Sequence, residues 1–385
     1  MEYDRNQQKT VLVIGGGVSG LMTAWILLDK GYNVSIVAKD WAGKTKQITS
    51  QIAGALWEYP PGGCGISEIE VPVLAYSQLE QYQKWAMQSF LFYKKMVDMD
   101  QANPKFGARM ITLYQFFHHD HSEAPIGGAS SKTLETAKKH YEKYEKIHKL
   151  DKGEAFHSVN HDGFHVEWGY RHQAPVIDTD KAMEFLMKLV QAKGAVLETR
   201  DIKGDLHLHE RELLDDFQAD IIVNASGLGA HTLANDNQVF PVRGAVKRIN
   251  IPHEFLKDNA VLLPQQYDAS NRPSKTVFIV PRNENTLVVG SIVQRNNWDL
   301  NLTHQSPEVE AMWARATDFI THLDAISADM RSNSCRIVHN YGHGGSGWTL
   351  AVGCAWTCVK LVEKVLHEGK SGSMANAEIR GLNQC

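Results

Sequence analysis

The feature that most constrains the fold is a glycine-rich turn near the start of the chain. A short apolar strand is predicted at 11–14 and an apolar helix at 18–30, and the turn between them reads Gly15-Gly-Gly17-Val-Ser-Gly20. A second strand is predicted at 33–38. The spacing G-x-G-x-x-G between a strand and a helix is typical of turns that bind the pyrophosphate of a dinucleotide. The sequence therefore predicts an α/β fold with a parallel sheet that begins with this unit.

Each glycine of the turn has an expected role. Gly15 permits the tight turn, Gly17 lets the backbone approach the pyrophosphate, and Gly20 lets the helix pack closely on the strand. An acidic residue about 20 positions further on would bind the ribose, and Asp40 stands there. The residues predicted to bind the dinucleotide in this segment are Gly15, Gly17, Val18, Ser19, Gly20, Lys39 and Asp40.

Two other strand ends are also rich in glycine. A buried parallel strand is predicted at 221–223, with the loop 224–229 as its exit. Near the C-terminus, the segment 336–350 contains four glycines between an apolar strand and a helix that extends to about 367. Ligands of open α/β sheets lie outside the carboxyl ends of the strands, and helix N-termini favour anions. Three glycine-rich strand ends in one chain favour a single extended ligand that contacts all of them.

In order and composition, these segments resemble the D-amino-acid oxidase family of FAD flavoproteins, which includes the D-aspartate oxidases. The run His-Asn-Tyr-Gly-His-Gly-Gly-Ser-Gly at 339–347 matches the family's C-terminal hallmark. The segment 50–57 is similar to its flavin-contacting loop, 241–247 to its Gly-Arg-Gly-type strand entry, and 278–298 to the sheet that covers the flavin. The resemblance extends from about 10 to 368 and is poor between about 100 and 170.

The resemblance implies FAD as the cofactor and a small-molecule substrate. It also implies transfer of a hydride from a substrate C–H to flavin N5, with molecular oxygen as the electron acceptor. No side chain is then required as the base, and Tyr341 and His343 are expected to brace the glycine turn. The further FAD contacts that it implies are Ser50, Ala53, Gly54, Ala55, Leu56, Ile202, Ser226, Gly227, Gly344, Gly345, Ser346, Gly347, Trp348 and Thr349.

The expected architecture has two domains, each built from separate segments of the chain. A doubly wound, Rossmann-like FAD-binding domain is expected from 1–60, 175–235 and 335–385, and a substrate or cap domain from 61–174 and 236–334. The second domain should place an antiparallel sheet over the flavin, with strands near 242–249, 276–280 and 286–293. Helices are predicted at 77–97, at 179–193 and, with a charged and solvated surface, at 133–148.

The resemblance weakens where the substrate should bind. Family members hold the amino-acid carboxylate with an arginine of a Gly-x-Arg-Pro-x-Arg segment, because a guanidinium pairs with a carboxylate in bidentate fashion. This chain has no such segment between Trp298 and His339, and Phe278 occupies the place of a family tyrosine. The candidates for the substrate pocket are Tyr267, Phe278, Arg282 and Arg295.

Three functions remain open. The first is an FAD-dependent oxidoreductase whose substrate is no simple amino acid, such as an intermediate of a natural product. The segment 60–65, Pro-Pro-Gly-Gly-Cys-Gly, would suit a reshaped pocket. The second is a D-amino-acid oxidase with a relocated arginine, which releases a 2-oxo acid, ammonia and hydrogen peroxide. The third is a non-catalytic flavin-binding protein.

Composition fits an ordinary enzyme of two domains. The chain has 385 residues, 43% of them hydrophobic, and a formal net charge of −4, which gives no electrostatic reason to expect nucleic acid as a partner. No apolar run approaches the roughly 20 residues that span a bilayer. The histidines at 118–121 are expected on an exposed turn, and the five cysteines lack metal-ligand spacing, so no metal is expected. The polar first residues and the absence of a final Ser-Lys-Leu lead us to expect a cytoplasmic protein.

Overall fold

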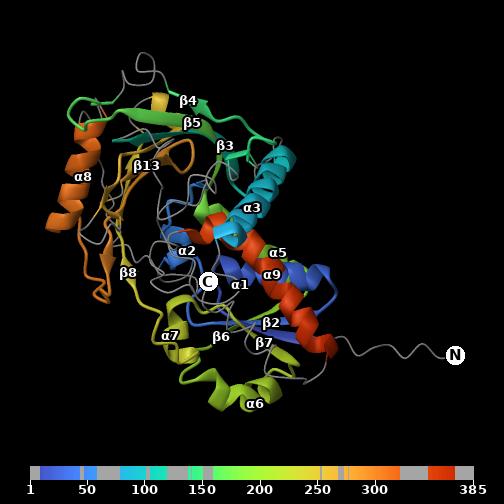
Figure 1. The fold of residues 1–385 in the computed structure, drawn as a ribbon. Helices are drawn as coiled ribbons and strands as arrows, with labels where there is room; N and C mark the ends of the chain where they lie inside the picture. Colours follow the sequence, from blue (N-terminus) through green and yellow to red (C-terminus); the bar gives the residue numbers. More distant parts are fainter. Residues whose placement is uncertain are drawn as a thin grey trace.

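The computed structural model describes two main sheets that share several helices (Figure 1). It describes residues 9–43, 47–58, 79–100, 105–118, 138–139, 141–150, 159–251, 254–267, 273–275, 277–320 and 346–368. Within these ranges, no helix combines the length and the apolar composition that a bilayer crossing needs.

The first sheet has four parallel strands in the order β6-β2-β1-β7. The strands are β1 (Thr10–Ile14), β2 (Asn33–Ala38), β6 (Val196–Thr199) and β7 (Ile221–Asn224). Ile14 is paired with Val37 on one side and with Asn224 on the other. The loops that leave β1 and β7 therefore begin at the same edge of the sheet.

Helices cover both faces of the parallel sheet, as the doubly wound prediction requires. Alternate residues of β1 point to opposite sides: Val11 and Val13 join the core with α1 (Val18–Asp29) and α5 (Thr179–Ala192), whereas Leu12 and Ile14 join the core with α6 (Leu206–Asp216). The short α7 (Ala230–Leu233) lies on the α6 side. The last helix, α9 (Gly347–Glu368), packs along α1 and α3 (Leu79–Asp100) (Figure 1).

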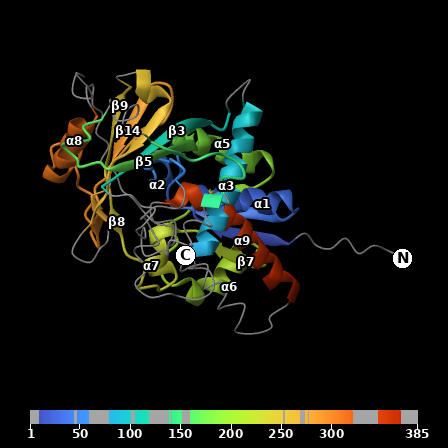
Figure 2. The same cartoon turned by 45° about the horizontal axis from the view of Figure 1, so that its top comes forward.

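The second sheet has seven strands in the order β4-β5-β3-β10-β13-β14-β9 (Figure 2). They are β3 (Ala108–Phe117), β4 (His148–Lys149), β5 (Trp168–Ile177), β9 (Val246–Asn250), β10 (Asn259–Leu262), β13 (Phe278–Pro281) and β14 (Thr286–Gly290). Among the described strands of this second sheet, only the β3–β10 pair is parallel. The predicted antiparallel sheet is therefore present, but it is wider than predicted, because β3, β4 and β5 extend it.

Two apolar cores lie on the two faces of this sheet. One face packs against α8 (Pro307–Phe319) and includes Ile279, Val289 and Phe319. The other face packs against α3 and α9, with Trp57 and Trp85 in its centre. Two small strand pairs lie outside these sheets: β8 (Val242–Arg243) with β15 (Gln294–Arg295), and β11 (Gln266–Tyr267) with β12 (Pro273–Lys275). The remaining described elements are the short helices α2 (Thr49–Ile52), η2 (Gly227–Gly229) and η3 (Glu254–Lys257).

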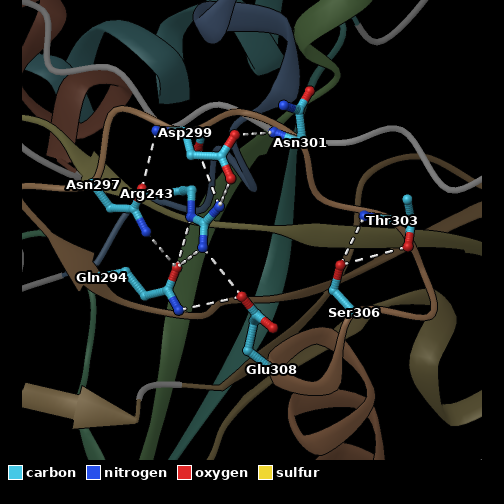
Figure 3. A network of polar contacts seen from close by, with 8 residues as sticks. All are labelled: Arg243, Gln294, Asn297, Asp299, Asn301, Thr303, Ser306 and Glu308. Carbon is cyan, nitrogen blue, oxygen red and sulfur yellow. Dashed lines mark hydrogen bonds and ion pairs between the residues drawn. The ribbon is translucent and has the colours of Figure 1, made fainter.

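A buried arginine divides the predicted strand 242–249 into β8 and β9. The Arg243 side chain donates from Nε to Gln294 Oε1 at 2.6 Å, from Nη1 to the Asp299 carbonyl at 3.1 Å and from Nη2 to Glu308 Oε1 at 3.1 Å. A buried guanidinium is stable only with such partners. The network ties β8 to β15, to the loop that follows it and to the first turn of α8 (Figure 3), so β8 leaves the main sheet.

The helix predicted at 133–148 is wrong at its C-terminal end, since His148 begins strand β4. Tyr141 explains the change. Its ring is fully buried and stacks on Trp57 with centroids 5.8 Å apart, and its hydroxyl donates to the Gln173 carbonyl at 2.6 Å. An anchored aromatic residue within a charged segment turns the chain toward β5. The domain boundaries remain a prediction, and β5, which lies in the second sheet, crosses the predicted boundary between 174 and 175.

Candidate cofactor and substrate site

The first glycine turn is packed against the loop that leaves β7. Gly15 has a φ of +128°, and its N–H donates to the Val37 carbonyl at 2.8 Å. A Cβ at Gly15 would lie 2.1 Å from the Ala225 carbonyl oxygen, and one at Gly20 would lie 1.9 Å from the Gly15 oxygen. These two glycines are therefore required by the packing of the chain itself.

Gly17 stands in a different environment. Its backbone is extended, with φ −80° and ψ 179°, and the nearest atom to an added Cβ is Ser50 Oγ at 3.2 Å. The space beside Gly17 leads to the first turn of α1, which has no acidic residue. Ser19 Oγ is buried there without a hydrogen-bond partner in the part of the chain that the structure describes. An orphaned hydroxyl beside a helix N-terminus fits a bound phosphate.

Ser50 joins this turn to the last helix. Its Oγ accepts a hydrogen bond from the Val18 N–H at 3.0 Å, and its carbonyl accepts one from Trp348 Nε1 at 2.9 Å. The Trp348 carbonyl in turn accepts a hydrogen bond from Tyr93 at 2.7 Å. The predicted N-terminal, loop and C-terminal FAD segments thus meet at one residue.

Only some of the other predicted FAD contacts near Ser50 belong to the described residues. Ser346, Trp348 and Thr349 are buried at the start of α9, which begins at Gly347. Gly344 and Gly345 lie outside the described residues, as do Tyr341 and His343.

The outer part of the predicted cofactor site follows β2 and β7. Lys39 is exposed and pairs with Asp201 at 3.8 Å, and Asp40 follows directly. Ser226 Oγ donates to Asn224 Oδ1 at 2.6 Å. Gly227 has a φ of +62°, and Ile202 packs on the α6 side of the sheet. These residues lie at the edge that the fingerprint predicts, and their contacts with FAD remain a prediction.

Arg282 does not have the role suggested for it as a substrate anchor. Only 1% of its surface is exposed, and its guanidinium donates to the carbonyls of Gln51, Ile52 and Ala53. These carbonyls end the short helix α2, where no further helical N–H is available. The hydrogen bonds fix the loop that carries Ser50 and leave the guanidinium engaged, so Arg282 is a poor candidate for binding a substrate carboxylate.

Phe278 lies against the same loop. An added Cβ at Gly54 would be 2.7 Å from the Phe278 ring, and one at Gly290 would also be 2.7 Å from it. The ring therefore fills the space between the loop and strand β14. Beyond Gly54, Ala55 adopts a φ of +53° and Leu56 pairs with Val176 of β5.

The two remaining substrate candidates are less informative. Arg295 is half-buried in β15, opposite Val242. Tyr267 is described only by its backbone, in β11. Of the histidines at 118–121, only His118 is described, and it is exposed with its Nδ1 3.4 Å from the His165 carbonyl.

A chain of hydrogen-bonded polar residues beside this site was not predicted from the sequence. Glu58 Oε1 accepts a hydrogen bond from Gln115 Nε2 at 3.4 Å, and Gln115 Oε1 accepts one from the Tyr170 hydroxyl at 2.6 Å. Burial raises the pKa of Glu58 to about 7. Position 58 directly follows the predicted flavin loop 50–57, but Gln115 and Tyr170 lie within the poorly matched region, so no motif connected them to it.

We expect Ser50→Ala to weaken FAD binding and to lower the free energy of unfolding by about 1 kcal/mol, because the Val18 N–H loses its acceptor. Urea unfolding and FAD titration of the apoprotein measure the two effects. Ser306→Ala is the matched control, since its Oγ accepts the Thr303 N–H at 3.0 Å far from this loop (Figure 3). An unchanged FAD affinity in Ser50→Ala would contradict the placement.

Comparison with known proteins gives concordant results. The family model described as DAO, FAD dependent oxidoreductase, matches residues 10–361. A D-amino-acid oxidase of Dictyostelium discoideum is 28% identical over 94% of this chain and 94% of its own length. One of Rubrobacter xylanophilus is 26% identical over 92% and 96%. The structure of glycine oxidase from Geobacillus kaustophilus superposes with a TM-score of 0.62 at 16% identity, covering 95% of this chain and 96% of that one, which shows the same fold.

Proposed function

Because this chain belongs to the DAO family of FAD-dependent oxidoreductases, we propose that it oxidises a substrate C–H bond and that its substrate is no simple amino acid. FAD is the cofactor of the family, and the enzyme is of the amino-acid oxidase type. When bound, FAD accepts the hydride of the substrate C–H at N5. Molecular oxygen is the proposed electron acceptor.

The chain's own residues would bind and orient the cofactor. Gly17 leaves room beside the first turn of α1, and Ser19 supplies a hydroxyl that lacks a partner among the described residues. The N–H groups of that turn carry partial positive charge, which suits a pyrophosphate. At the other end, Ser50 and Trp348 fix the first turn of α9 beside the loop 50–56, so this helix N-terminus would face the flavin.

One observation carries the proposal on the substrate: Nη1 and Nη2 of Arg282 donate to backbone carbonyls, while Phe278 lies against the flavin loop. A phenylalanine cannot donate the hydrogen bond that a tyrosine would offer to a carboxylate. Both findings support a pocket that is apolar where the family binds the amino-acid carboxylate. An intermediate of a natural product is a substrate class that would suit such a pocket.

A second candidate is an ordinary D-amino-acid oxidase whose carboxylate anchor has moved. The full-length similarity to the Dictyostelium and Rubrobacter enzymes favours it. Arg295 would then be the described candidate for the anchor. A non-catalytic flavin-binding protein is the third possibility, and it predicts a flavin that no substrate reduces.

We expect D-alanine and D-aspartate to be poor substrates. Loss of a bidentate arginine pair and of a tyrosine hydroxyl would remove about 3–5 kcal/mol of positioning, which corresponds to a kcat/KM lower by on the order of 10²–10³. Peroxide release and anaerobic flavin bleaching should be measured with a panel of D-amino acids and larger amines, with dithionite reduction as the control for intact flavin. Rapid, stereospecific oxidation of D-alanine or D-aspartate that is lost in Arg295→Met would instead establish the ordinary oxidase.

A further inference from the structure

The polar chain at Glu58 lies on the same sheet face as Phe278. The pairing of the strands places five residues in one row across the sheet, each opposite the next. The row consists of Tyr170, Gln115, Leu262, Phe278 and Gly290. Directly paired residues share a face, and neighbouring strands are about 4.8 Å apart. Gln115 is two strands from Phe278, hence about 10 Å away. Glu58, hydrogen-bonded to Gln115, therefore lies within the span of a small ligand from the flavin loop.

The amide of Gln115 has a fixed orientation. The Tyr170 hydroxyl donates to its Oε1 at 2.6 Å, which directs its Nε2 toward Glu58. Gln115 and Tyr170 are both buried, whereas Glu58 is partly exposed. The carboxylate thus has one neutral donor at 3.4 Å, on a residue that is only partly buried.

No positive charge compensates this carboxylate within the described part of the chain. Burial raises the pKa of Glu58 and the Gln115 hydrogen bond lowers it, and no charged side chain among the described residues adds to these two influences. The titratable groups nearby stay neutral near pH 7. Burial lowers the pKa of His172 to about 4, and it raises the pKa of Tyr170 and of Tyr141 above the ordinary tyrosine value.

We propose that Glu58 binds a cationic amine of the substrate, held in place by the Gln115–Tyr170 pair. A partly buried carboxylate without a cation gains most from a ligand that supplies one. The inference rests on the proposed function, and it narrows the substrate class to molecules with a protonated amine in addition to the C–H bond that is oxidised. Recognition would then rely on a cation, where the family relies on the carboxylate of an amino acid.

D-lysine and D-norleucine are a matched pair of probes, because they have side chains of similar length and only the first ends in a cation. Anaerobic titration of the FAD-loaded protein, followed by the shift of the oxidised flavin band, measures their binding. We expect D-lysine to bind about 10- to 100-fold more tightly than D-norleucine at pH 8, the range for a charge-assisted hydrogen bond. Glu58→Gln should reduce this preference to less than about threefold and leave D-norleucine binding unchanged.

The pH dependence provides a second measurement, which needs no variant. A bound cation stabilises the ionised carboxylate, so affinity for D-lysine should rise by about tenfold between pH 6 and pH 8, as a group with a pKa of about 7 loses its proton. D-norleucine should show no such rise. Calorimetry in two buffers of different ionisation enthalpy should detect proton release with D-lysine only.

Control measurements distinguish amine binding by Glu58 from the proposed oxidation of the substrate. Glu212→Gln, an exposed position on α6, should leave the preference unchanged, and Glu58→Asp should retain part of it. Equal binding of the two probes, or full preference in Glu58→Gln, would overturn the role of Glu58 even if the enzyme oxidises both. Selective, pH-dependent binding of D-lysine to a flavin that no compound of the amine panel reduces would confirm Glu58 and overturn the proposed oxidation.

Discussion

Replacing Gly20 by alanine should destabilise the whole protein, whereas replacing Gly17 by alanine should remove FAD and leave the apoprotein folded. The Gly20 Cβ would lie 1.9 Å from the Gly15 carbonyl oxygen, a backbone atom that cannot rotate away. We expect a loss of about 3 kcal/mol or more of unfolding free energy, at the upper end of overpacking effects. The better helix propensity of alanine offsets about 1 kcal/mol at most.

Gly17 has ordinary extended backbone angles and only a 3.2 Å approach to a serine hydroxyl. Alanine fits the apoprotein there with a small shift of that side chain, but its methyl group would occupy the space through which the pyrophosphate approaches. Loss of two charge-assisted hydrogen bonds would weaken FAD binding by on the order of 10²-fold.

Urea unfolding of the apoproteins and fluorescence titration with FAD distinguish the two variants. Gly31→Ala serves as the control for a glycine of positive φ, since nothing lies within 4 Å of its Cβ and its effect should be limited to backbone strain. If Gly17→Ala retained full FAD affinity, the pyrophosphate would have to bind elsewhere.

Arg282→Met should lower the unfolding free energy by about 3–5 kcal/mol. The substitution leaves the carbonyls of Ile52 and Ala53 without their buried donor, and each unsatisfied group costs about 1–3 kcal/mol. The loop that carries Ser50 would lose its anchor to β13 and β14, so FAD should also dissociate more readily.

The control is Arg200→Met, which removes an exposed pair with Asp216 and should cost less than about 1 kcal/mol. Arg282→Lys keeps the positive charge but lacks the planar guanidinium group. Its loss of unfolding free energy should lie between those of Arg282→Met and Arg200→Met. An Arg282→Met protein of unchanged stability that had lost only its activity toward D-amino acids would show that Arg282 is the relocated carboxylate anchor.

Local patterns account for what the sequence predicted well. The unit from β1 to β2, the helices α1 and α5 and the start of the last helix were predicted because each pattern is contained in a short stretch. The role of Arg282 was not predictable in this way, since its acceptors lie about 230 residues earlier in the chain. Glu58 depends on Gln115, and Tyr141 on Gln173, and only the register of β3 and β5 brings these residues together.

The position of α9 has a consequence for how the chain acquires its fold during synthesis. α1 is among the first elements to leave the ribosome, but the helix that covers it begins only at Gly347. β7, which pairs with β1 at the edge of the described parallel sheet, also follows both long strands of the second sheet. The part of the apolar surface of α1 that contacts α9 therefore stays uncovered for most of translation, and exposed surfaces of this kind are bound by chaperones. The nascent polypeptide would complete its two main sheets with β14, whereas α9 would cover α1 only after release of nearly the entire chain.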